Sequence, residues 1–264
     1  MTTTFEASFS ITHITTASAI LHIDGGNFLT DPVFSPAGTE WDMGPTVLKN
    51  TKGPALQLED LPVIDAVLLS HEDHPDNLDE LGRRLLDGRK VLTTQDGARK
   101  LAPRPGVQAL KPGETTLLRV GGREFEFTGV PCQHLPGGEV TGFVLRAANF
   151  GETNGLPNVI YISGDTVYLD EIPKLLEKYH VSVAILNVGA VEVAITDHPL
   201  LVTMDGKQAA RLFREIGADV LVPMHYESWA HFAENGDQLR AVLEEEGVAD
   251  KVRWLKPGVE TKIF

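Results

Sequence analysis

The chain has 264 residues, of which 42% are hydrophobic, and this allows one large layered domain over residues 1–264. Its formal net charge is −14, and because so acidic a surface repels phosphate backbones, we expect no nucleic-acid partner. No stretch approaches the roughly 20 consecutive apolar residues that a membrane-spanning helix requires, so we expect no membrane partner.

The first part of the chain predicts a β-hairpin, a long loop and a buried strand. Alternating apolar residues over 9–35, interrupted by the turn sequence at 24–27, indicate the hairpin. Residues 36–60 are rich in Gly, Pro and Thr and predict a long loop, a kind of segment that is often functional. Residues 63–70 predict a strand without alternation, as expected for a strand buried on both faces.

Helices and strands then alternate to the end of the chain. Residues 75–86 predict a helix, with Pro75 near its first turn and Gly88 just beyond its end. We expect further helices at 95–101, 169–179, 206–216 and 238–246, and strands at 90–94, 107–130, 141–149, 158–162, 181–188, 220–224, 252–255 and 259–263. This alternation favours an α/β or α+β fold.

Several predicted strands end at or just before a histidine or an aspartate. The residues concerned are His71, followed closely by His74 and Asp76, and then His134, Asp165 and His225. Strand ends of a layered domain gather at one edge of the sheets, where sites are built. Imidazole and carboxylate groups at that edge are ligands that a divalent transition metal prefers. The pattern therefore predicts a metal site.

Each of these residues also has an ordinary structural explanation. His71 could cap a turn, His134 could lie in a solvated loop, and His225 could be a core histidine. The close spacing of His71, His74 and Asp76 favours ligation, because one short loop then supplies several ligands. For Cys132, a buried structural thiol is favoured over a thiolate ligand.

Four stretches resemble, in their order along the chain, the metallo-β-lactamase superfamily, and in particular its lactonase-like (ascorbate-phosphate lactonase-like) branch. They are LTDPVF at 29–34, SHEDHPDNLD at 70–79, ISGDT at 162–166, and TMD at 203–205 with PMHY at 223–226. The resemblance implies a four-layer αβ/βα sandwich, with the site along the joint edge of two sheets.

The family's main motif, His-x-His-x-Asp-His, is altered in this chain. If one residue is inserted after His71, then His74 takes the second histidine place. Asp76 then takes the aspartate place, and Asn77 the last histidine place. With strict spacing, Asp73 replaces the second histidine, Pro75 replaces the aspartate and Asp76 replaces the last histidine. The inserted alignment is preferred, because it loses one ligand where the strict alignment changes three.

The resemblance implies two metal positions on the inserted alignment. The first position would be held by His71, His74, His134 and Asp165. Such a set suits Zn²⁺, with Mn²⁺ and Fe²⁺ as alternatives. The second would be held by Asp76, Asp165 and His225, with only the neutral amide oxygen of Asn77 in the last histidine place. The second metal should bind more weakly or be absent, which gives one or two metals per chain.

These residues predict a metal-dependent hydrolase that acts on a small molecule through a metal-activated water. Asp76 would orient that water and accept its proton, and a metal or His225 would stabilise the oxyanion. The resemblance favours a lactone or another ester as the substrate. The alternatives are a phosphodiesterase acting on a small substrate, and a non-catalytic metal-binding or ligand-binding relative, which the loss of a histidine at Asn77 favours.

The walls of the site and the cellular location rest on weaker signals. Trp41, Tyr226 and Trp229 are candidates for the substrate wall, and His198 and His231 are weaker candidates for substrate contact. One cysteine cannot form an internal disulfide, and the first residues show no basic segment followed by an apolar one. We therefore expect a cytoplasmic protein, and homo-oligomers are compatible with this composition.

Overall fold

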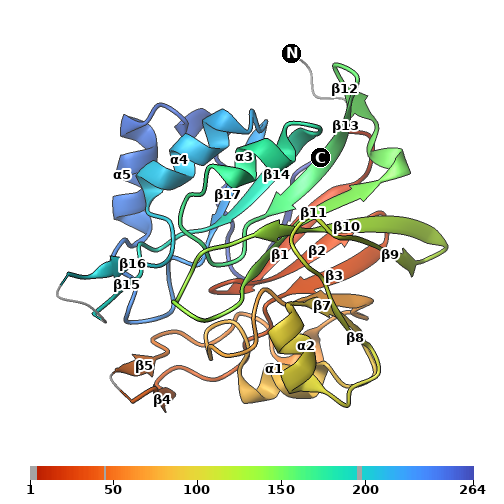
Figure 1. Ribbon diagram of the computed structural model, residues 1–264. Coiled ribbons are helices and arrows are strands. Elements are labelled where there is room, and N and C mark those ends of the chain that lie inside the picture. The colour runs from red at the N-terminus through yellow and green to blue at the C-terminus, as the bar shows by residue number, and fades with distance from the viewer. Residues whose placement is uncertain (1–4, 45, 195–197) are drawn as a thin grey trace.

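The computed structural model describes residues 5–44, 46–194 and 198–264, and two large sheets face each other in it (Figure 1). The first sheet has the strand order β18 (Glu260–Lys262), β1 (Phe9–Thr15), β2 (Ser18–Ile23), β3 (Gly26–Thr30), β6 (Ala66–Leu68), β7 (Lys90–Thr93) and β8 (Val107–Ala109). The second has the order β17 (Val220–Met224), β14 (His180–Asn187), β13 (Leu156–Ile162), β11 (Thr141–Ala147), β10 (Arg123–Pro131) and β9 (Thr115–Val120), with β12 (Glu152–Thr153) beside β13.

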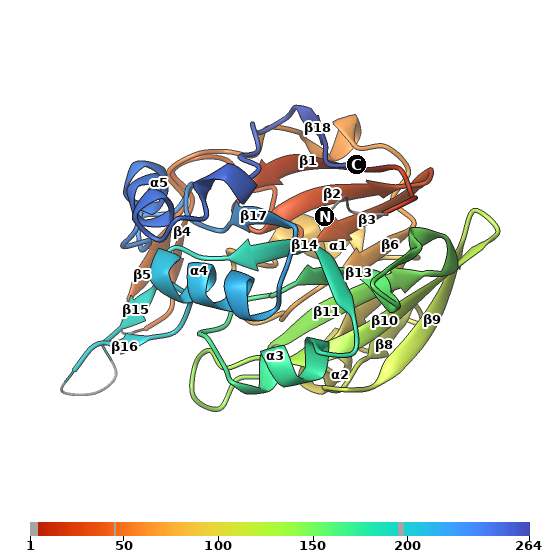
Figure 2. The ribbon, with the colours of Figure 1, turned by 90° about the horizontal axis from the view of Figure 1, so that it is seen from above.

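Helices cover the outer face of each sheet (Figures 1 and 2). The first sheet is covered by α1 (Glu80–Leu85) and α2 (Gln95–Leu101), and the second by α3 (Glu171–Leu176), α4 (Gly206–Glu215) and α5 (Gly236–Glu245). The order of layers is thus helices, sheet, sheet, helices. The expected four-layer αβ/βα sandwich is confirmed.

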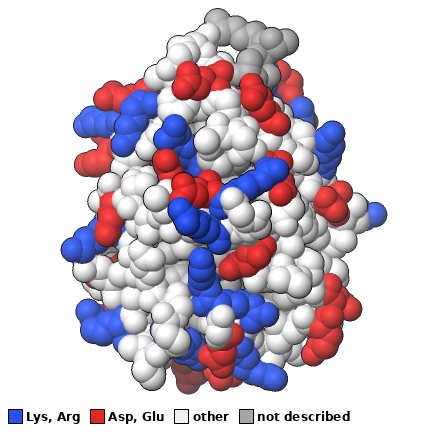
Figure 3. Space-filling model, turned by 90° about the vertical axis from the view of Figure 1, so that its right-hand side faces the viewer, with Lys and Arg blue, Asp and Glu red and all other residues white. Residues whose placement is uncertain are grey.

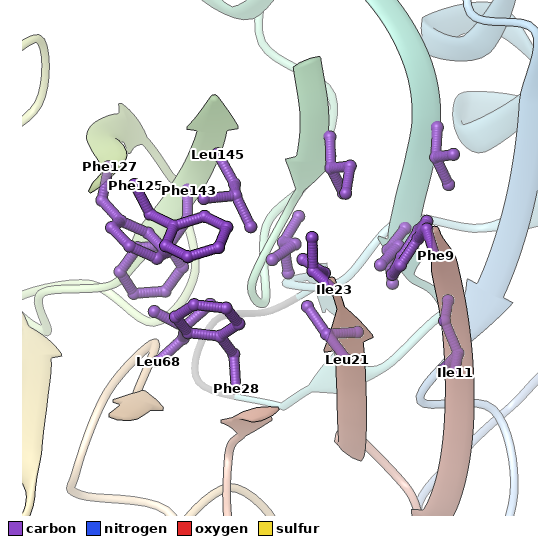
Figure 4. Packing of buried hydrophobic residues seen from close by; sticks show 14 of the residues in the cluster. Phe9, Ile11, Leu21, Ile23, Phe28, Leu68, Phe125, Phe127, Phe143 and Leu145 are labelled. Atoms are coloured by element: carbon purple, nitrogen blue, oxygen red, sulfur yellow. The ribbon is translucent and has the colours of Figure 1, made fainter. Parts of the chain in front are cut away.

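The apolar core between the two sheets holds them face to face. Phe28 of β3 contacts Phe125 and Phe127 of β10, with ring centroids 5.0 and 5.5 Å apart (Figure 4). All three rings are buried, and aromatic pairs at these separations add to the free energy gained by burial. These contacts join the two sheets directly.

Strands in the middle of the second sheet are buried on both faces. In β14 the residues after His180 are all buried, and every residue of β17 is buried. Alternate side chains face either the core between the sheets or the core beneath α3, α4 and α5. This is why both segments are apolar without alternation in the sequence.

Strand direction brings the functional segments to one edge. β13 is parallel to β14, and β14 is parallel to β17. β10 and β13 are each antiparallel to β11, so β10 points the same way as β13. The carboxyl ends of these four strands therefore meet at one edge of the second sheet.

Two additional β-hairpins lie at the same end of the molecule (Figures 1 and 2). β4 (Glu40–Asp42) pairs with β5 (Val47–Lys49), and β15 (Glu192–Val193) pairs with β16 (Leu200–Leu201). The expectation of an irregular loop over 36–60 is thus wrong in part, because it contains the first hairpin and a short 3-10 turn at Leu58–Asp60. The sequence did not predict β4 and β5, because each has only three residues, too few for a clear alternation of apolar and polar residues.

Other element boundaries also differ from the expected ones. The helix expected at 75–86 begins at Glu80, because the Asp79 carboxylate caps it by accepting a hydrogen bond from the Gly82 backbone N–H at 2.7 Å. The strand expected at 63–70 is limited to β6, and Val63 is 80% exposed. The expected strand at 252–255 is only a bridge between Val252 and Leu221.

The N-terminal hairpin expected over 9–35 is instead a three-stranded meander. An additional turn at Thr16, whose φ is 45°, separates β1 from β2, and the expected turn separates β2 from β3. The turn could not be predicted from the sequence, because neither Thr16 nor Ala17 is a typical turn residue.

Within the described residues, no helix is long and apolar enough to cross a membrane. Acidic and basic side chains are interspersed on the face that Figure 3 shows. Surface ion pairs such as Arg119–Glu124 (2.7 Å) and Arg146–Glu126 (3.0 Å) mix the two signs in the same way. Residues 1–4, part of the segment considered above for a leader sequence, lie outside the described residues.

Replacing Phe28 with alanine should destabilise the protein strongly. Phe28→Ala removes the ring that joins the two sheets and leaves a cavity, so we expect the free energy of unfolding to fall by about 3–5 kcal/mol. Leu117→Ala, at a β9 position that is 56% exposed, should change it by less than about 0.5 kcal/mol. Urea unfolding of both variants measures the difference, and equal effects would contradict this account of the core.

Candidate metal centre

Three histidine side chains from two loops converge at the edge where the strands end. His71 follows β6, His74 lies in the next turn, and His134 follows β10. One nitrogen from each ring lies within 4.8 Å of the other two, and in the described part of the chain these are the three side chains whose ligand atoms all lie that close to one another. The geometry thus brings together three of the residues expected at the first position.

The separations within this group match those of metal ligands. His71 Nε2 lies 3.0 Å from His74 Nδ1, and His134 Nε2 lies 3.3 Å from the same atom. Two nitrogen ligands of a tetrahedral zinc ion, each about 2.0–2.1 Å from it, lie about 3.3 Å apart. The donor set therefore fits a divalent transition metal.

Hydrogen bonds behind the rings orient them. The second nitrogen of His71, Nδ1, donates to Ser70 Oγ at 2.8 Å, and Ser70 Oγ donates to Asp31 Oδ2 at 2.9 Å. His134 Nδ1 donates to the backbone carbonyl of Val202 at 2.7 Å. Both rings thus turn Nε2 towards the common point, as supporting hydrogen bonds do in metal sites.

The ring protonation states also suit ligation. Burial, together with the neighbouring His74 imidazole, holds the pKa of His71 well below its usual value. Burial likewise lowers the pKa of His134. Both imidazoles are therefore neutral at pH 7, and a metal need not displace a proton from their lone pairs.

Asp165 lies between this group and a second one. Its Oδ2 lies 4.0 Å from His71 Nε2 and 3.3 Å from His225 Nε2, and its Oδ1 accepts a hydrogen bond from Asn187 Nδ2 at 2.7 Å. Burial disfavours the charged carboxylate, but the surrounding histidines outweigh it and lower the pKa of Asp165. The same oxygen thus faces both groups.

A glycine makes the turn that presents Asp165. Gly164 has a φ of 61°, a left-handed conformation, and a Cβ there would lie 2.8 Å from the Thr141 carbonyl oxygen. Any other residue would collide with this backbone.

The second group centres on His225, directly after β17. Its Nδ1 donates to the Val188 carbonyl at 3.1 Å, while Nε2 is buried and has no hydrogen-bond partner among the described residues. This Nε2 lies 3.4 Å from Asp76 Oδ2 and 3.3 Å from Asp165 Oδ2. A buried nitrogen aimed between two carboxylates without a hydrogen bond is an arrangement that a cation completes.

The pKa values of His225 and Asp76 also indicate that this group favours a positive charge. Burial alone would lower the pKa of His225, but the Asp165 and Asp76 carboxylates raise it to about 9. Burial would raise the pKa of Asp76, yet the neighbouring His225 and His231 hold it well below its ordinary value. His225 also has a φ of 62°, a strained conformation for a residue with a side chain. Two anionic carboxylates here are compensated by a proton on His225 when no metal is bound.

Asn77 is fully buried among the carboxylates of this site. With its amide nitrogen towards them, it donates to Asp165 Oδ2 at 3.2 Å and Asp76 Oδ1 at 3.3 Å, whereas the opposite orientation leaves its oxygen facing only acceptors. The amide oxygen then points away from the second group. In this orientation Asn77 donates to two carboxylates, and its part as an amide-oxygen ligand stays a prediction.

The placement of residues 73 and 74 bears on the alignment of the altered motif. Asp73 is exposed, while His74 contacts both His71 and His134. The geometry favours the alignment with an inserted residue.

Both groups open into a cavity of about 430 Å³. His74, Asp76, His134, Asp165, His225 and His231 lie at its floor, and its walls hold Met43, Thr46, Leu48, Leu135, Val191, Glu192, Val193, Ala194, Val202 and Thr203. Most wall residues are apolar and come from the two hairpins or from segments beside them. Among the described residues that line the cavity, none is Lys or Arg.

The aromatic residues expected to form the wall lie elsewhere. Trp41 stacks on Trp229, with ring centroids 4.9 Å apart, and the indole of Trp229 donates to Thr16 Oγ1 at 2.9 Å. Tyr226 packs against Trp254. None of the three expected residues is in the cavity lining, because each is used in packing. Of the two weaker histidine candidates, His231 lines the cavity and His198 does not.

The sequence analysis missed three residues that support the site: Asp31 and Ser70, which orient His71, and Asn187, which holds Asp165. It named His231 for substrate contact only, and the structure adds its contact with Asp76. Asp31 and Ser70 lay within recognised stretches, and Asn187 ends a predicted strand in the same way as the residues singled out. A wider search for polar residues at strand ends could have found Asn187.

Comparison with known proteins shows the family of this chain. The family described as beta-lactamase superfamily domain matches residues 26–226. A UPF0173 metal-dependent hydrolase of Anaeromyxobacter sp. (strain K) is 31% identical over 244 residues, covering 86% of this chain and 81% of that protein. A UPF0173 metal-dependent hydrolase of Listeria monocytogenes is 29% identical over 224 residues, covering 82% and 90%.

Solved structures show the same fold. An isothiocyanate hydrolase from Delia radicum gut bacteria has a TM-score of 0.77 at 23% identity and covers 96% of this chain and 98% of its own. Igni18, a metallo hydrolase from Ignicoccus hospitalis, has a TM-score of 0.71 at 23% identity and covers 97% and 99%. Fold and site together define the class of metal-dependent hydrolases with the metallo-β-lactamase fold. The chain belongs to the β-lactamase superfamily.

The Cys132 thiol should be unreactive in the folded protein. Burial raises the pKa of Cys132, and its thiol donates to the Ser163 carbonyl at 3.2 Å, so the nucleophilic thiolate is scarce. We expect a disulfide reagent at pH 8 to label the folded chain at least about tenfold more slowly than the urea-unfolded chain. Equal labelling rates would show that Cys132 is an accessible thiolate.

Proposed function

We propose that this protein is a metal-dependent hydrolase that attacks the electrophilic carbon of a small, largely apolar lactone or other ester. The observation that carries the proposal is the group of His71, His74 and His134, which opens into a cavity with apolar walls. When bound, a divalent metal would lower the pKa of a water molecule and supply hydroxide near neutral pH. His71, His74, His134 and Asp165 would hold one such ion, with Zn²⁺ first and Mn²⁺ or Fe²⁺ as alternatives.

The chain's own residues complete the chemistry. Asp76 is ionised, lies at the cavity floor, and is placed to orient the attacking water and accept its proton. The apolar walls exclude bulk water and select an uncharged substrate body.

Charge at the cavity separates this proposal from a phosphodiesterase. Enzymes that bind phosphate groups commonly surround them with Arg and Lys, and no described residue lining this cavity is basic. Glu192 adds a carboxylate to the wall, which further disfavours an anionic substrate. A lactone, an ester or another neutral electrophile fits better.

A non-catalytic relative is the other alternative. In such a protein nothing would preserve an ionised carboxylate at the floor of the cavity. Here Asp76 is buried, is held by hydrogen bonds from His231 and Asn77, and faces the open space. This arrangement supports hydrolysis.

We expect the protein to bind Zn²⁺ or Mn²⁺ and to hydrolyse a neutral ester or lactone. The test is elemental analysis of protein purified without chelator, followed by turnover on a panel of lactones, aryl esters, an isothiocyanate and a phosphodiester. The isothiocyanate is included because a structural relative is named as an isothiocyanate hydrolase. A folded chain that takes up no metal would refute the proposal. Turnover of the phosphodiester alone would show that the substrate is a phosphodiester and not an ester or lactone.

Asp165→Asn should abolish most of this activity while leaving the fold intact. The variant keeps the shape of the side chain but removes the charge that faces both groups, so we expect kcat/KM to fall by more than roughly 100-fold. His22→Ala is the control and should keep activity, because the His22 ring in β2 hydrogen-bonds Thr12 of β1 and Asn27 of β3 and does not line the cavity. Near-normal turnover in Asp165→Asn would show that the carboxylate has no catalytic part.

A further inference from the structure

One histidine outside the altered motif lies against the second group. His231 is in the irregular segment between β17 and α5, and its Nε2 lies 3.1 Å from Asp76 Oδ2. His225 Nε2 approaches the same oxygen at 3.4 Å. Two imidazole nitrogens from different segments thus flank one carboxylate oxygen.

Three of the separations around Asp76 and His225 match those between two neighbouring ligands of one ion. Donor atoms about 2.0–2.1 Å from a tetrahedral metal lie about 3.3 Å apart. The pairs His231–Asp76, His225–Asp76 and His225–Asp165 measure 3.1, 3.4 and 3.3 Å. The spacing is as close to this value as in the group of His71, His74 and His134.

Asn77 cannot supply the missing nitrogen ligand to this group. Its amide nitrogen is used to donate to Asp76 and Asp165, and an amide nitrogen has no free lone pair for a metal. His231 offers an imidazole that lines the cavity and lies 3.1 Å from Asp76 Oδ2. We propose that His231 is a ligand of a second divalent metal, together with Asp76, His225 and Asp165, and takes the place of the histidine that the motif lacks at position 77.

The environment of His231 differs from that of a histidine in a surface ion pair. His180, for example, is the first residue of β14, pairs with Asp219 at 2.6 Å and does not line the cavity. His231 is 19% exposed, lines the cavity, and packs against Phe232 and Trp229. Its Nδ1 is buried and has no hydrogen-bond partner in the described part of the chain, so nothing on that side holds the ring. A metal at Nε2 would hold it.

This inference rests on the proposed metal-dependent function, and metal content tests it independently of activity. Full-length protein is loaded with Zn²⁺, desalted and analysed for zinc per chain, and binding is followed by calorimetry. The wild type should retain two ions. His231→Ala should retain one, with the affinity for the second ion lowered at least roughly tenfold. His180→Ala, which removes a histidine from a simple ion pair, should retain two.

A rescue variant sharpens the comparison. Asn77→His in the His231→Ala background returns an imidazole to the motif position beside Asp76, and it should restore the second ion. Circular dichroism establishes that each variant is folded; if the rescue variant is not, the His231→Ala and His180→Ala pair decides the outcome.

Two results would overturn the inference: a wild type that binds one ion only, and an undiminished second ion in His231→Ala. If the second result comes with a shifted pH profile of hydrolysis, His231 acts in proton transfer and not as a ligand. The first ion does not involve His231. A wild type that binds no ion at all would therefore count against the proposed function as a whole.

Discussion

The burial of three carboxylates around one point is the constraint on which the site depends. Asp31, Asp76 and Asp165 are each at most 5% exposed, and burial of a charge is costly unless a partner compensates it. Burial and the charge of Asp165 raise the pKa of Asp31 to about 8, so that carboxyl is largely protonated at neutral pH. The other two are ionised, and neighbouring imidazoles supply the compensation.

The sandwich maintains this otherwise unfavourable arrangement because its two halves each contribute part of it. Asp31, Ser70 and His71 come from the first sheet, and His134, Asp165 and His225 follow strands of the second. The buried aromatic contacts between the sheets therefore also fix the distances between ligands (Figure 4). The packing between the two sheets thus determines both the stability of the core and the geometry of the site.

The sequence was most informative where regular structure ends. An apolar run followed by His71, Asp165 or His225 shows both a buried strand and the polar residue at its exit, and parallel strands bring such exits together. His231 lacked that signal, because it lies in an irregular segment whose path is set by contacts with Trp229 and Phe232. The orientation of the Asn77 amide could not be predicted either, since it depends on the Asp76 and Asp165 carboxylates, which lie far apart in the sequence.

The two hairpins β4–β5 and β15–β16 stand apart from the four layers (Figure 2). They contribute to the cavity walls through Leu48, Glu192 and Val193, yet none of these three residues belongs to the buried core. Substitutions, insertions or deletions in the hairpins would reshape the entrance without disturbing the floor. In evolution, substrate preference is therefore free to diverge while the catalytic apparatus is inherited unchanged, and two relatives with the same histidines need not share a substrate.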